Sequence, residues 1–573
     1  MNSLKIFVIV FASFLATTGF AQWSSDPSVN NAICTFANEQ ETPVLCSDGD
    51  NGAIIAWWDH RTDAGDIYAQ RIDKNGILQW SSNGVPICVI QNKQSAPSII
   101  SDDKGGAIIT WDDERTGVYS GNIYAQRINS IGQVQWLANG SPVKVGAAYT
   151  PKIVSDDAGG AIIAWRDDRL STDAADIYAQ RIDSSGNILW SPSTGIAVVT
   201  TASQQFPSYI ISDDSGGAII IWTHVRADGT RNLFAQRINA SGSKIWTSAG
   251  VTIVSLATSS QAPTAQPDKQ GGFYVLWNDS RGSSGNRKIY GQHFNSSGVS
   301  QWNANGNRLT RETLDLDGPA NFIVDGSNGL IFGYSQSISY YDKTIFAQRV
   351  GNDGTVLWDT LGVPICARKW GRERPEIISD ANGGAILCWF DDRTPESEIY
   401  PLSLYDIYAQ RIDLSGNILW EVNGVPVSNA ANGQSIPKIL TVDGGSAIIV
   451  WDDYRNNNHD IYAQKIYSNG TVTNVQTPEL IPDEFVLYQN YPNPFNPSTM
   501  ISWQSPVGSH QTLKVFDVLG NEVVTLVNEY KPAGSYEVEF NPESSIKNPA
   551  SGVYFYQLKS GDYLETKKMM LLK

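Results

Sequence analysis

The chain has 573 residues, of which 41% are hydrophobic and 17% charged, and its formal net charge is −17. A chain of this length exceeds one ordinary hydrophobic core, so we expect several domains or a repeat array. The acidic excess argues against nucleic acid or an anionic membrane surface as a partner, because attraction to phosphate requires a basic patch.

The first 21 residues have the composition of a secretory signal peptide. Lys5 lies in a short polar start, residues 6–16 form a mainly apolar run, and small residues precede Gln22. The apolar run is too short to span a bilayer. We therefore expect signal cleavage between Ala21 and Gln22, and no transmembrane anchor.

Residues 22–475 contain eight copies of one sequence unit. An aromatic residue ends an apolar run in each copy, at successive spacings of 54 to 62 residues. These aromatics are Trp57, Trp111, Trp165, Trp222, Trp277, Tyr334, Trp389 and Trp451. A second marker, Ile-Tyr-Ala-Gln-Arg-Ile or a close variant, follows each of them. A repeat with this period indicates a solenoid or a propeller.

Each copy contains four short runs typical of β-strands. In the second copy they are residues 97–100, 107–111, 123–128 and 134–136. β-branched and aromatic residues dominate the runs, and Gly-containing turns separate them. The pattern predicts a four-stranded antiparallel meander whose two faces must be covered by neighbouring copies, as in a propeller blade.

The ends of the repeat region predict how the ring closes. A Trp marks the fourth run in seven copies and is missing from the last one. Residues 22–25, Gln-Trp-Ser-Ser, repeat residues 79–82 and precede the first copy. We therefore predict an all-β fold, an eight-bladed β-propeller of four-stranded antiparallel blades closed by the N-terminal strand, which removes an exposed edge.

The repeat stops at Val475, and residues 476–484 have the Pro and acid content of a linker. Residues 485–573 contain further strand-like runs at 512–518, 522–527, 535–540, 552–558 and 567–572, with Gly-marked turns between them. The size and pattern predict a small Ig-like β-sandwich.

Several motifs of this tail resemble a known family. They are Tyr491-Pro492-Asn493-Pro494-Phe495-Asn496-Pro497, residues 515–520, 533–536 and 550–556, and the basic ending 567–573. In this order they resemble the C-terminal sorting domain of type IX (Por) secretion cargo. The resemblance implies that residues 485–573 bind outer-membrane secretion machinery, and that the protein reaches the extracellular space or outer-membrane surface of a Gram-negative bacterium.

The motif Trp-x-Asp-x-Arg carries the most distinctive chemistry and occurs in six copies. Because residues i, i+2 and i+4 of a strand share a face, these three side chains are expected to meet. One interpretation is a ring of sites for an anionic glycan, and the other is a structural latch repeated in each blade. Repetition favours the latch, since binding sites arise where loops vary. In the fourth copy His224 replaces the Asp, and the sixth copy has Gln336 and Ile338 at the Asp and Arg positions.

No cofactor is expected, although the acidic Ser-Asp-Asp-x-Gly-Gly turns raise the possibility of calcium. Their spacing lacks the ligand series of a known calcium loop, and Asp that caps its own turn explains them better. Among the five Cys, Cys34 and Cys46 are close enough in sequence to form a disulfide. Cys88 and Cys366 occupy equivalent positions in two copies and are interpreted as small buried residues.

The chain shows no catalytic motif and no metal-ligand spacing. The leading hypothesis is a secreted or surface-attached propeller that binds a glycan or protein ligand through its variable loops. Tyr400 and Tyr405, in the long loop 394–405 of the seventh copy, are candidate ligand contacts, with packing over the rim as the other interpretation. The alternative function is an extracellular carbohydrate-active hydrolase that uses paired carboxylates on the propeller face.

Overall fold

The computed structural model describes most of the chain. The described residues are 23–62, 64–117, 121–170, 175–256, 260–281, 286–310, 316–317, 321–337, 343–367, 372–392, 405–472, 484–531, 534–542, 550–561 and 563–572. They divide into two compact units, Met1–Asn474 and Val475–Lys573. The predicted cleavage residues Ala21 and Gln22 lie outside the described residues.

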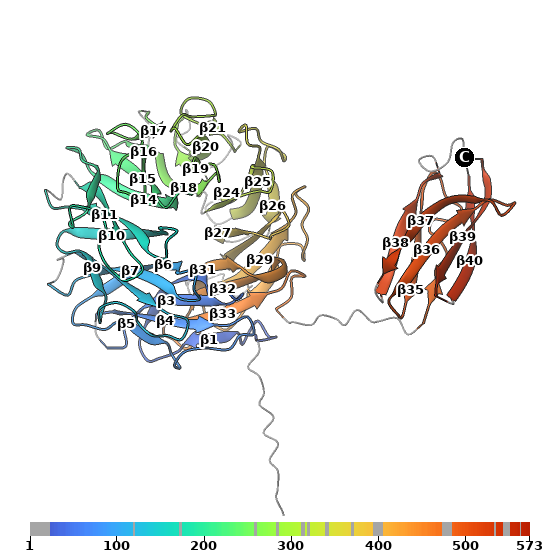
Figure 1. The fold of residues 1–573 in the computed structure, drawn as a ribbon, viewed down its shortest axis with the longest axis horizontal. Coiled ribbons are helices and arrows are strands. Elements are labelled where there is room, and N and C mark those ends of the chain that lie inside the picture. The colour runs from blue at the N-terminus through green and yellow to red at the C-terminus, as the bar shows by residue number, and fades with distance from the viewer. Residues whose placement is uncertain are drawn as a thin grey trace, which may run out of the picture. The chain divides into compact units, whose positions relative to one another are not determined.

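The first unit is all-β, and its described residues form eight antiparallel sheets that follow one another around a ring (Figure 1). We number the sheets from the first to the eighth in chain order of their innermost strands. The first three are β2 (Gln40–Ser47), β3 (Ala53–Asp59), β4 (Asp66–Ile72), β5 (Val85–Cys88); β6 (Gln94–Ser101), β7 (Ala107–Asp113), β8 (Asn122–Ile128), β9 (Ser141–Lys144); and β10 (Ala148–Ser155), β11 (Ala161–Asp167), β12 (Asp176–Ile182), β13 (Ile196–Val199).

The fourth to seventh sheets repeat this order. They are β14 (Gln205–Ser212), β15 (Ala218–Val225), β16 (Arg231–Ile238), β17 (Val251–Val254); β18 (Ser260–Pro267), β19 (Phe273–Asp279), β20 (Lys288–Phe294), β21 (Asn307–Arg308); β22 (Leu316–Asp317), β23 (Phe322–Val324), β24 (Leu330–Ser337), β25 (Lys343–Val350), β26 (Val363–Cys366); and β27 (Arg372–Ser379), β28 (Ala385–Asp391), β29 (Asp406–Ile412), β30 (Val425–Ser428). In the sixth sheet both β22 and β23 pair with β24.

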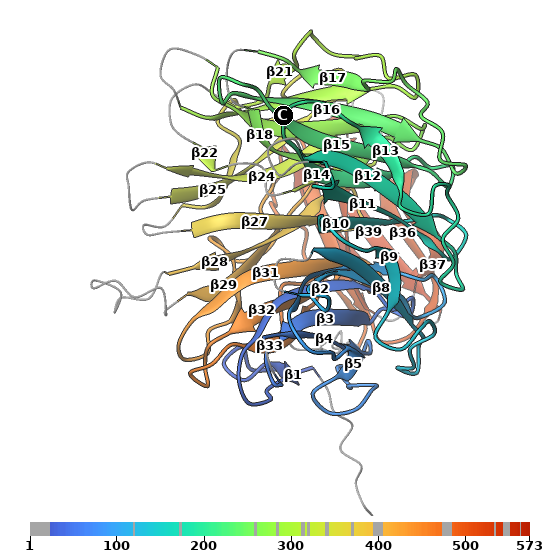
Figure 2. The ribbon, with the colours of Figure 1, turned by 90° about the vertical axis from the view of Figure 1, so that its left-hand side faces the viewer.

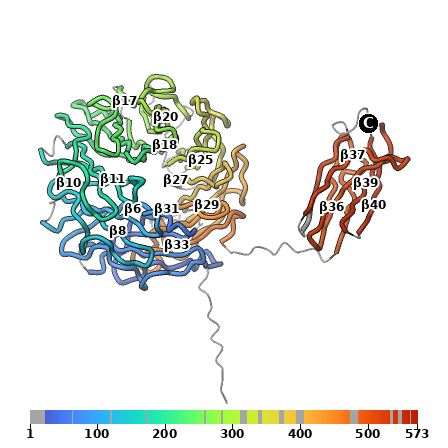
Figure 3. Tube along the Cα trace, viewed as in Figure 1, coloured from blue at the N-terminus to red at the C-terminus, as the bar shows by residue number. Residues whose placement is uncertain are grey.

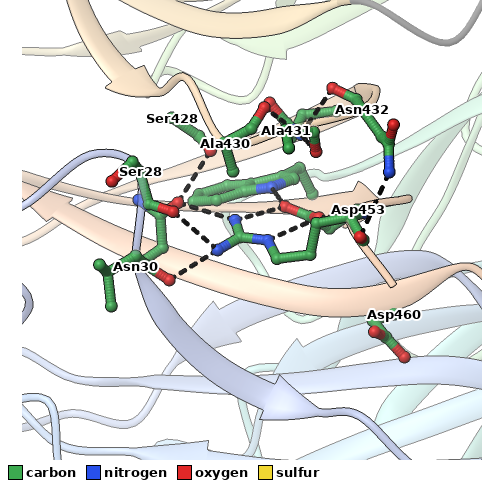
Figure 4. A network of polar contacts seen from close by, with 12 residues as sticks. Ser28, Asn30, Ser428, Ala430, Ala431, Asn432, Asp453 and Asp460 are labelled. Carbon is green, nitrogen blue, oxygen red and sulfur yellow. Dashed lines mark hydrogen bonds and ion pairs between the residues drawn. The ribbon is translucent and has the colours of Figure 1, made fainter. Parts of the chain in front are cut away.

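The eighth sheet contains strands from both ends of the unit. Its members are β31 (Gln434–Thr441), β32 (Ala447–Asp453), β33 (Asp460–Ile466) and β1 (Asn31–Cys34), and a short 3₁₀ turn, η2 (Asp443–Gly445), joins β31 to β32. β1 pairs antiparallel with β33, where Asn31 lies opposite Ala463. Figure 4 shows Ser28 and Asn30 of this N-terminal segment beside Asp453 and Ser428.

The cores of the unit lie between neighbouring sheets. In one of them Trp111 of β7 packs with Cys88 and Ile87 of the preceding sheet. The same kind of core joins the eighth sheet to the first, where Ile448 and Val450 pack with Ile55. Both faces of each central strand are covered by neighbouring sheets. The sequences of β3, β7 and β11 are therefore largely apolar rather than alternating. The unit resembles a β-propeller, and the tube view shows the same arrangement (Figure 3).

The prediction that the Trp-bearing run is the fourth strand is wrong. In the second sheet Val134 makes only an isolated bridge with Ile128, and the fourth strand is Ser141–Lys144. The Trp instead reaches the next sheet, because Trp80 Nε1 donates to Ser130 O at 3.1 Å. Gly132, with φ +80°, packs against that indole so closely that a Cβ atom at this position would lie only 2.8 Å from Trp80 Cδ1.

The N-terminal strand is likewise displaced from its predicted position. The strand that pairs with β33 is Asn31–Cys34, eight residues beyond Trp23. Trp23 keeps the inter-sheet role, since its Nε1 donates to Lys74 O at 2.9 Å in the first sheet. Gln464 Nε2 donates to Ser24 O, which matches the bond from Gln70 Nε2 to Ser81 O.

The second unit has two antiparallel sheets that share one core. The sheets are β34 (Val486–Leu487), β35 (Thr499–Ser505), β38 (Gly534–Phe540) and β37 (Glu522–Lys531), β36 (Ser509–Phe516), β39 (Gly552–Ser560), β40 (Tyr563–Leu571). Trp503 and Phe540 of one sheet pack with Leu513 and Tyr556 of the other. The five runs predicted between residues 512 and 572 correspond to β36–β40, whereas β34 and β35 were not predicted.

The Cys34–Cys46 disulfide that the sequence spacing allows is absent, because both residues are free thiols and buried, as are the other three Cys. Cys34 lies at the end of β1 and Cys46 on β2, so they belong to different sheets. The buried positions of Cys88 and Cys366 agree with their interpretation as small core residues. The described part of the chain contains no helix with the length and hydropathy needed to cross a membrane.

Candidate functional site

The Trp-x-Asp-x-Arg motif forms a buried latch. In the second sheet Asp113 accepts hydrogen bonds from Trp111 Nε1 at 2.8 Å and from Arg115 Nε at 2.8 Å. Arg115 Nη2 also donates to Asn139 O at 2.7 Å, and its guanidinium lies 3.5 Å from the centre of the Tyr124 ring. Every hydrogen-bonding direction of the carboxylate is thus used within the sheet, which makes the latch a structural element.

The latch recurs in the first, third, fifth and eighth sheets, although in the fifth sheet Arg281 Nε has no hydrogen-bond partner among the described residues. The Arg-to-Asp distances there are 2.6 Å. In the seventh sheet Trp389 Nε1 donates to Asp391 at 3.0 Å, and Arg393 lies outside the described residues. In the first, third, fifth and eighth sheets the Asp side chain is buried and its carboxylate accepts hydrogen bonds from the Trp and the Arg of the same sheet. This agrees with the structural interpretation of the motif rather than with a ring of ligand sites.

A second polar pair, which was not anticipated, stabilises the opposite end of the meander; it is an Asp–Arg pair in six sheets and Asp268–His293 in the fifth. Asp102 Oδ1 accepts from the backbone N–H of Lys104 and Gly106 at 2.9 and 2.7 Å, as a capped turn requires. Its Oδ2 accepts from Arg127 Nη2 at 2.7 Å. The Arg is the one in the Tyr-Ala-Gln-Arg marker, so the marker's recurrence was the signal for this pair. The acidic turns are therefore occupied by protein donors.

The fourth sheet lacks the latch and has a cavity beside it. The strand β15 continues to Val225, and a tight turn follows in which Arg226 N donates to Thr230 O at 2.9 Å. Arg226 therefore points to its turn neighbour Asp228 and is exposed. The space that the Arg guanidinium fills in the sheets with a complete latch is left open here, and a cavity of about 490 Å³ is found there.

The cavity is lined by groups of differing character. Its residues are Val199, Thr200, Thr201, Trp222, His224, Phe234, Lys244, Ser248 and Ala249. Phe234 stands where Tyr124 stands in the second sheet, and its ring stacks on Trp222 at 5.9 Å. Within the described residues, the indole N–H of Trp222 and the Lys244 ammonium have no hydrogen-bond or ion-pair partner. The cavity volume lies in the range of small-molecule sites.

Two titratable groups of the cavity are shifted toward their neutral forms. Burial lowers the pKa of His224, and the charge of Arg226 acts in the same direction. Burial also lowers the pKa of Lys244. His224 Nδ1 lies 3.3 Å from Gln205 Nε2, so the imidazole is held against β14. The cavity thus offers N–H donors and aromatic faces.

The residue after each latch Trp lies on the opposite side of the strand, and its identity differs among the sheets. In the second sheet it is Asp112, whose Oδ1 accepts from Thr150 N of β10 at 2.9 Å. Burial raises the pKa of Asp112 to about 7, against the lowering effect of the Thr150 N–H and of Lys152. In the eighth sheet the equivalent Asp452 is buried, and its pKa is raised in the same way, with Glu41 adding to the effect.

The predicted ligand loop is only partly described. Tyr400 lies outside the described residues, whereas Tyr405 precedes β29 and packs edge-on against Phe390, with ring centres 5.1 Å apart. Phe390 follows the latch residue Trp389, so Tyr405 lies beside the variable position of the seventh sheet. Figure 2 shows β28 and β29 of this sheet from the side.

The predicted sorting motif has buried and exposed members. Phe495 is buried in the core of the second unit, and its backbone exchanges hydrogen bonds with Met570 and Leu572 at 2.9 and 3.0 Å. Asn493 Oδ1 accepts from Met570 N at 3.0 Å. Tyr491 is 82% exposed. Pro492, Pro494, Asn496 and Pro497 complete the segment, which runs beside the final strand β40.

Residues 489–572 match the family model described as the secretion system C-terminal sorting domain. The C-terminal unit is therefore a sorting domain, and the chain is a cargo protein of type IX secretion. This assignment implies export to the extracellular or cell-surface space and handling by the type IX machinery.

The comparison with curated proteins found no match. Among solved structures, the chain is similar to Sqt1 from Chaetomium thermophilum, with 12% identity, a TM-score of 0.39, and coverage of 76% of this chain and 98% of that one. It is also similar to the α-L-arabinofuranosidase Arb93A of Fusarium graminearum (11%, TM-score 0.35, 68% and 97%) and to an α-L-arabinanase of Penicillium chrysogenum (11%, 0.34, 67% and 96%). Values this low assign the chain neither a fold nor an activity.

Proposed function

We propose that this exported protein is a binding protein whose first unit is a closed eight-bladed propeller, completed by the N-terminal strand β1. Three contacts support closure. β1 is hydrogen-bonded to β33, Trp23 bonds to the first sheet, and β2 contacts β31 and β32. β1 covers the edge of β33 that would otherwise be exposed, which suits a protein that functions outside the cell.

The observation that carries the binding function is the cavity of the fourth sheet. It exists because the fourth copy lacks the Asp of the latch and its Arg226 points away, so the space that the Arg fills in the sheets with the latch stays open. Phe234 offers a ring for stacking on a sugar, while Trp222 and Lys244 offer N–H donors without partners in the described structure. We infer an extracellular glycan with a carboxylate group as the ligand, since Lys244 would pair with the carboxylate.

The test uses the exported chain from residue 22 and a labelled acidic oligosaccharide array. Ala249→Trp would place a large side chain in the cavity, and we expect affinity for the bound oligosaccharide to fall at least tenfold. Thr194→Trp is the matched control, because Thr194 holds the same position in the third sheet, where Arg169 already fills the space. Equal binding by both variants, or no binding by the unmodified protein, would refute the proposal.

A carbohydrate-active hydrolase is the second candidate function. The observation in its favour is the raised pKa of Asp112, which suits a general acid, with Glu114 two residues further on as a second carboxylate. Release of reducing ends from a polysaccharide, abolished in Asp112→Asn, would support it. Binding of the glycan without its hydrolysis would exclude the hydrolase and support the binding function.

For the sorting domain, we propose that the exposed part of segment 491–497 contacts the secretion machinery, with Tyr491 as the principal contact. Its exposure contrasts with the buried Phe495, which holds the segment to the sandwich. Tyr400 and Tyr405 are proposed as additional ligand contacts on the loop face of the seventh blade. Release into the medium and attachment to the cell surface are both compatible with this route.

A further inference from the structure

The seam between the first and eighth sheets brings together two carboxylates and an imidazole. Glu39 precedes β2, Glu41 lies on β2, and His459 directly precedes β33. One ligand atom from each of the three side chains lies within 4.8 Å of the other two. The set therefore joins the start of the repeat region to its end.

The backbone fixes this arrangement. Gln40 N donates to His459 O at 2.7 Å, and His459 N donates to Glu39 Oε2 at 2.8 Å. The same backbone bond occurs at the next seam, from Gln94 N to Gly65 O at 2.7 Å. The backbone contact is thus a general property of the repeat.

The side chains at these positions are particular to the closing seam. At the next seam, Lys93 and Ser95 stand where Glu39 and Glu41 stand, and Gly65 stands where His459 stands. The shared backbone geometry therefore does not require two carboxylates and a His. Their presence calls for a separate explanation.

Two buried polar atoms here have no partner among the described residues. The first is Nδ1 of His459, whose ring packs against Tyr454 at 5.2 Å between ring centres. The second is Oδ1 of Asp452, a residue 4% exposed that lies within electrostatic reach of Glu41. A buried polar atom without a partner costs about 1–3 kcal/mol, so native structures usually satisfy it with protein, water or an ion.

We propose that Glu39, Glu41 and His459 bind one divalent transition-metal cation, with zinc as the first choice, and that the cation fastens the N-terminal segment to the last blade. Imidazole nitrogen with carboxylate oxygens is a donor set that zinc accepts, whereas calcium and magnesium prefer oxygen alone. Three protein ligands leave a fourth position for water. This site is separate from the cavity of the fourth sheet.

The cation would stabilise the folded ring, because it binds the assembled seam and not the unfolded chain. The test uses the chain from residue 22, stripped of metal with a chelator and titrated with ZnCl₂. We expect one bound equivalent by calorimetry and a Tm that rises with zinc concentration. Glu41→Gln and His459→Ala should reduce affinity at least tenfold while the metal-free Tm stays near that of the unmodified protein.

Ser95→Ala is the matched control at the neighbouring seam, and it should bind zinc normally. Zinc affinity equal to the unmodified protein in both seam variants would overturn the proposal, as would the absence of binding. Tight binding of Ca²⁺ or Mg²⁺ with no binding of Zn²⁺ would overturn the assignment to a transition metal. Glu41→Gln is nearly isosteric, so its metal-free Tm separates lost binding from lost folding.

Discussion

Arg455 Nη2 donates a hydrogen bond to Asn30 Oδ1 at 2.9 Å, across 425 positions of sequence. Asn30 also accepts from Ser428 Oγ at 2.8 Å and donates to Val427 O at 2.9 Å. One amide thus links the N-terminal segment with the latch of the eighth sheet and with the outer strand of the seventh (Figure 4).

Asn30→Ala should lower the free energy of unfolding by about 2–3 kcal/mol. The substitution leaves Ser428 without its acceptor and removes one acceptor from the Arg455 guanidinium in a buried site. Urea unfolding followed by Trp fluorescence measures the change. Asn75→Ala, at an exposed turn position, should change it by no more than about 0.5 kcal/mol. Equal effects of the two substitutions would argue against closure by the N-terminal segment.

Asp113→Ala should destabilise the protein by about 3–5 kcal/mol, because it leaves the Arg115 guanidinium and the Trp111 indole N–H buried without their acceptor. Asp50→Ala is the control, since the Asp50–Lys74 pair is exposed and 3.4 Å long, and such pairs contribute less than about 1 kcal/mol. Chemical denaturation of both variants gives the comparison. A stable Asp113→Ala protein that had lost ligand binding would reverse the structural interpretation of the latch.

Asp112→Asn should stabilise the protein increasingly as the pH rises from about 4 to about 7. The folded-state pKa of Asp112 is raised to about 7 by burial, well above the value of about 3.9 expected in the unfolded chain. Between these values the folded state binds more protons, so the stability of the unmodified protein falls as the pH rises. The Asn variant lacks this loss and keeps an acceptor for Thr150 N–H.

The measurement is the difference in unfolding free energy between Asp112→Asn and the unmodified protein at several pH values. Other titrating groups are common to both proteins and cancel in the difference. A difference that is constant across this interval would show that Asp112 has an ordinary pKa in the folded protein.

Phe495→Ala and Tyr491→Ala should affect export by different routes. Phe495 is buried in the sandwich, and its truncation should cost about 3–5 kcal/mol of sorting-domain stability. Tyr491 is largely exposed, so its truncation should leave the thermal unfolding of residues 485–573 unchanged while lowering the secreted fraction. Immunoblots of periplasm and medium measure export. Normal secretion of Tyr491→Ala would contradict the role of Tyr491 as a contact to the secretion machinery. Normal secretion of a chain ending at residue 484 would contradict the sorting role of residues 485–573.

Much of the fold could be predicted from the repeat, because the same turn and strand signals recur in each copy and reinforce one another. The fourth strand was misplaced because an indole next to β-branched residues resembles a strand in sequence. Trp80 is in fact a contact to Ser130 of the next sheet, and the paired residues 85–88 have a weaker signal. The alternation of apolar and polar residues within a run indicates a strand, but it does not show which side chains contact the next sheet.

The replacement of the latch Asp by His224 indicated that the fourth sheet differs from the others, but the cavity itself depends on the direction in which Arg226 points. The Asp228-Gly229 turn signal predicts a tight hairpin, and a hairpin that continues β15 carries Arg226 away from the sheet. The Glu39, Glu41 and His459 set could not be found from spacing, since Glu41 and His459 are 418 positions apart in sequence. Only the juxtaposition of β2 with the residues before β33 reveals it.

The pairing of β1 with β33 also has a consequence for the order of events during export. Residues 31–34 are synthesised early, yet their partner strand, residues 460–466, is synthesised after nearly all the other strands of the unit. The sorting domain follows within a few tens of residues. A prematurely terminated product that lacks the partner of β1 therefore also lacks the signal for the outer membrane. The order of the chain thus makes the sorting signal available only after every strand of the first unit has been synthesised.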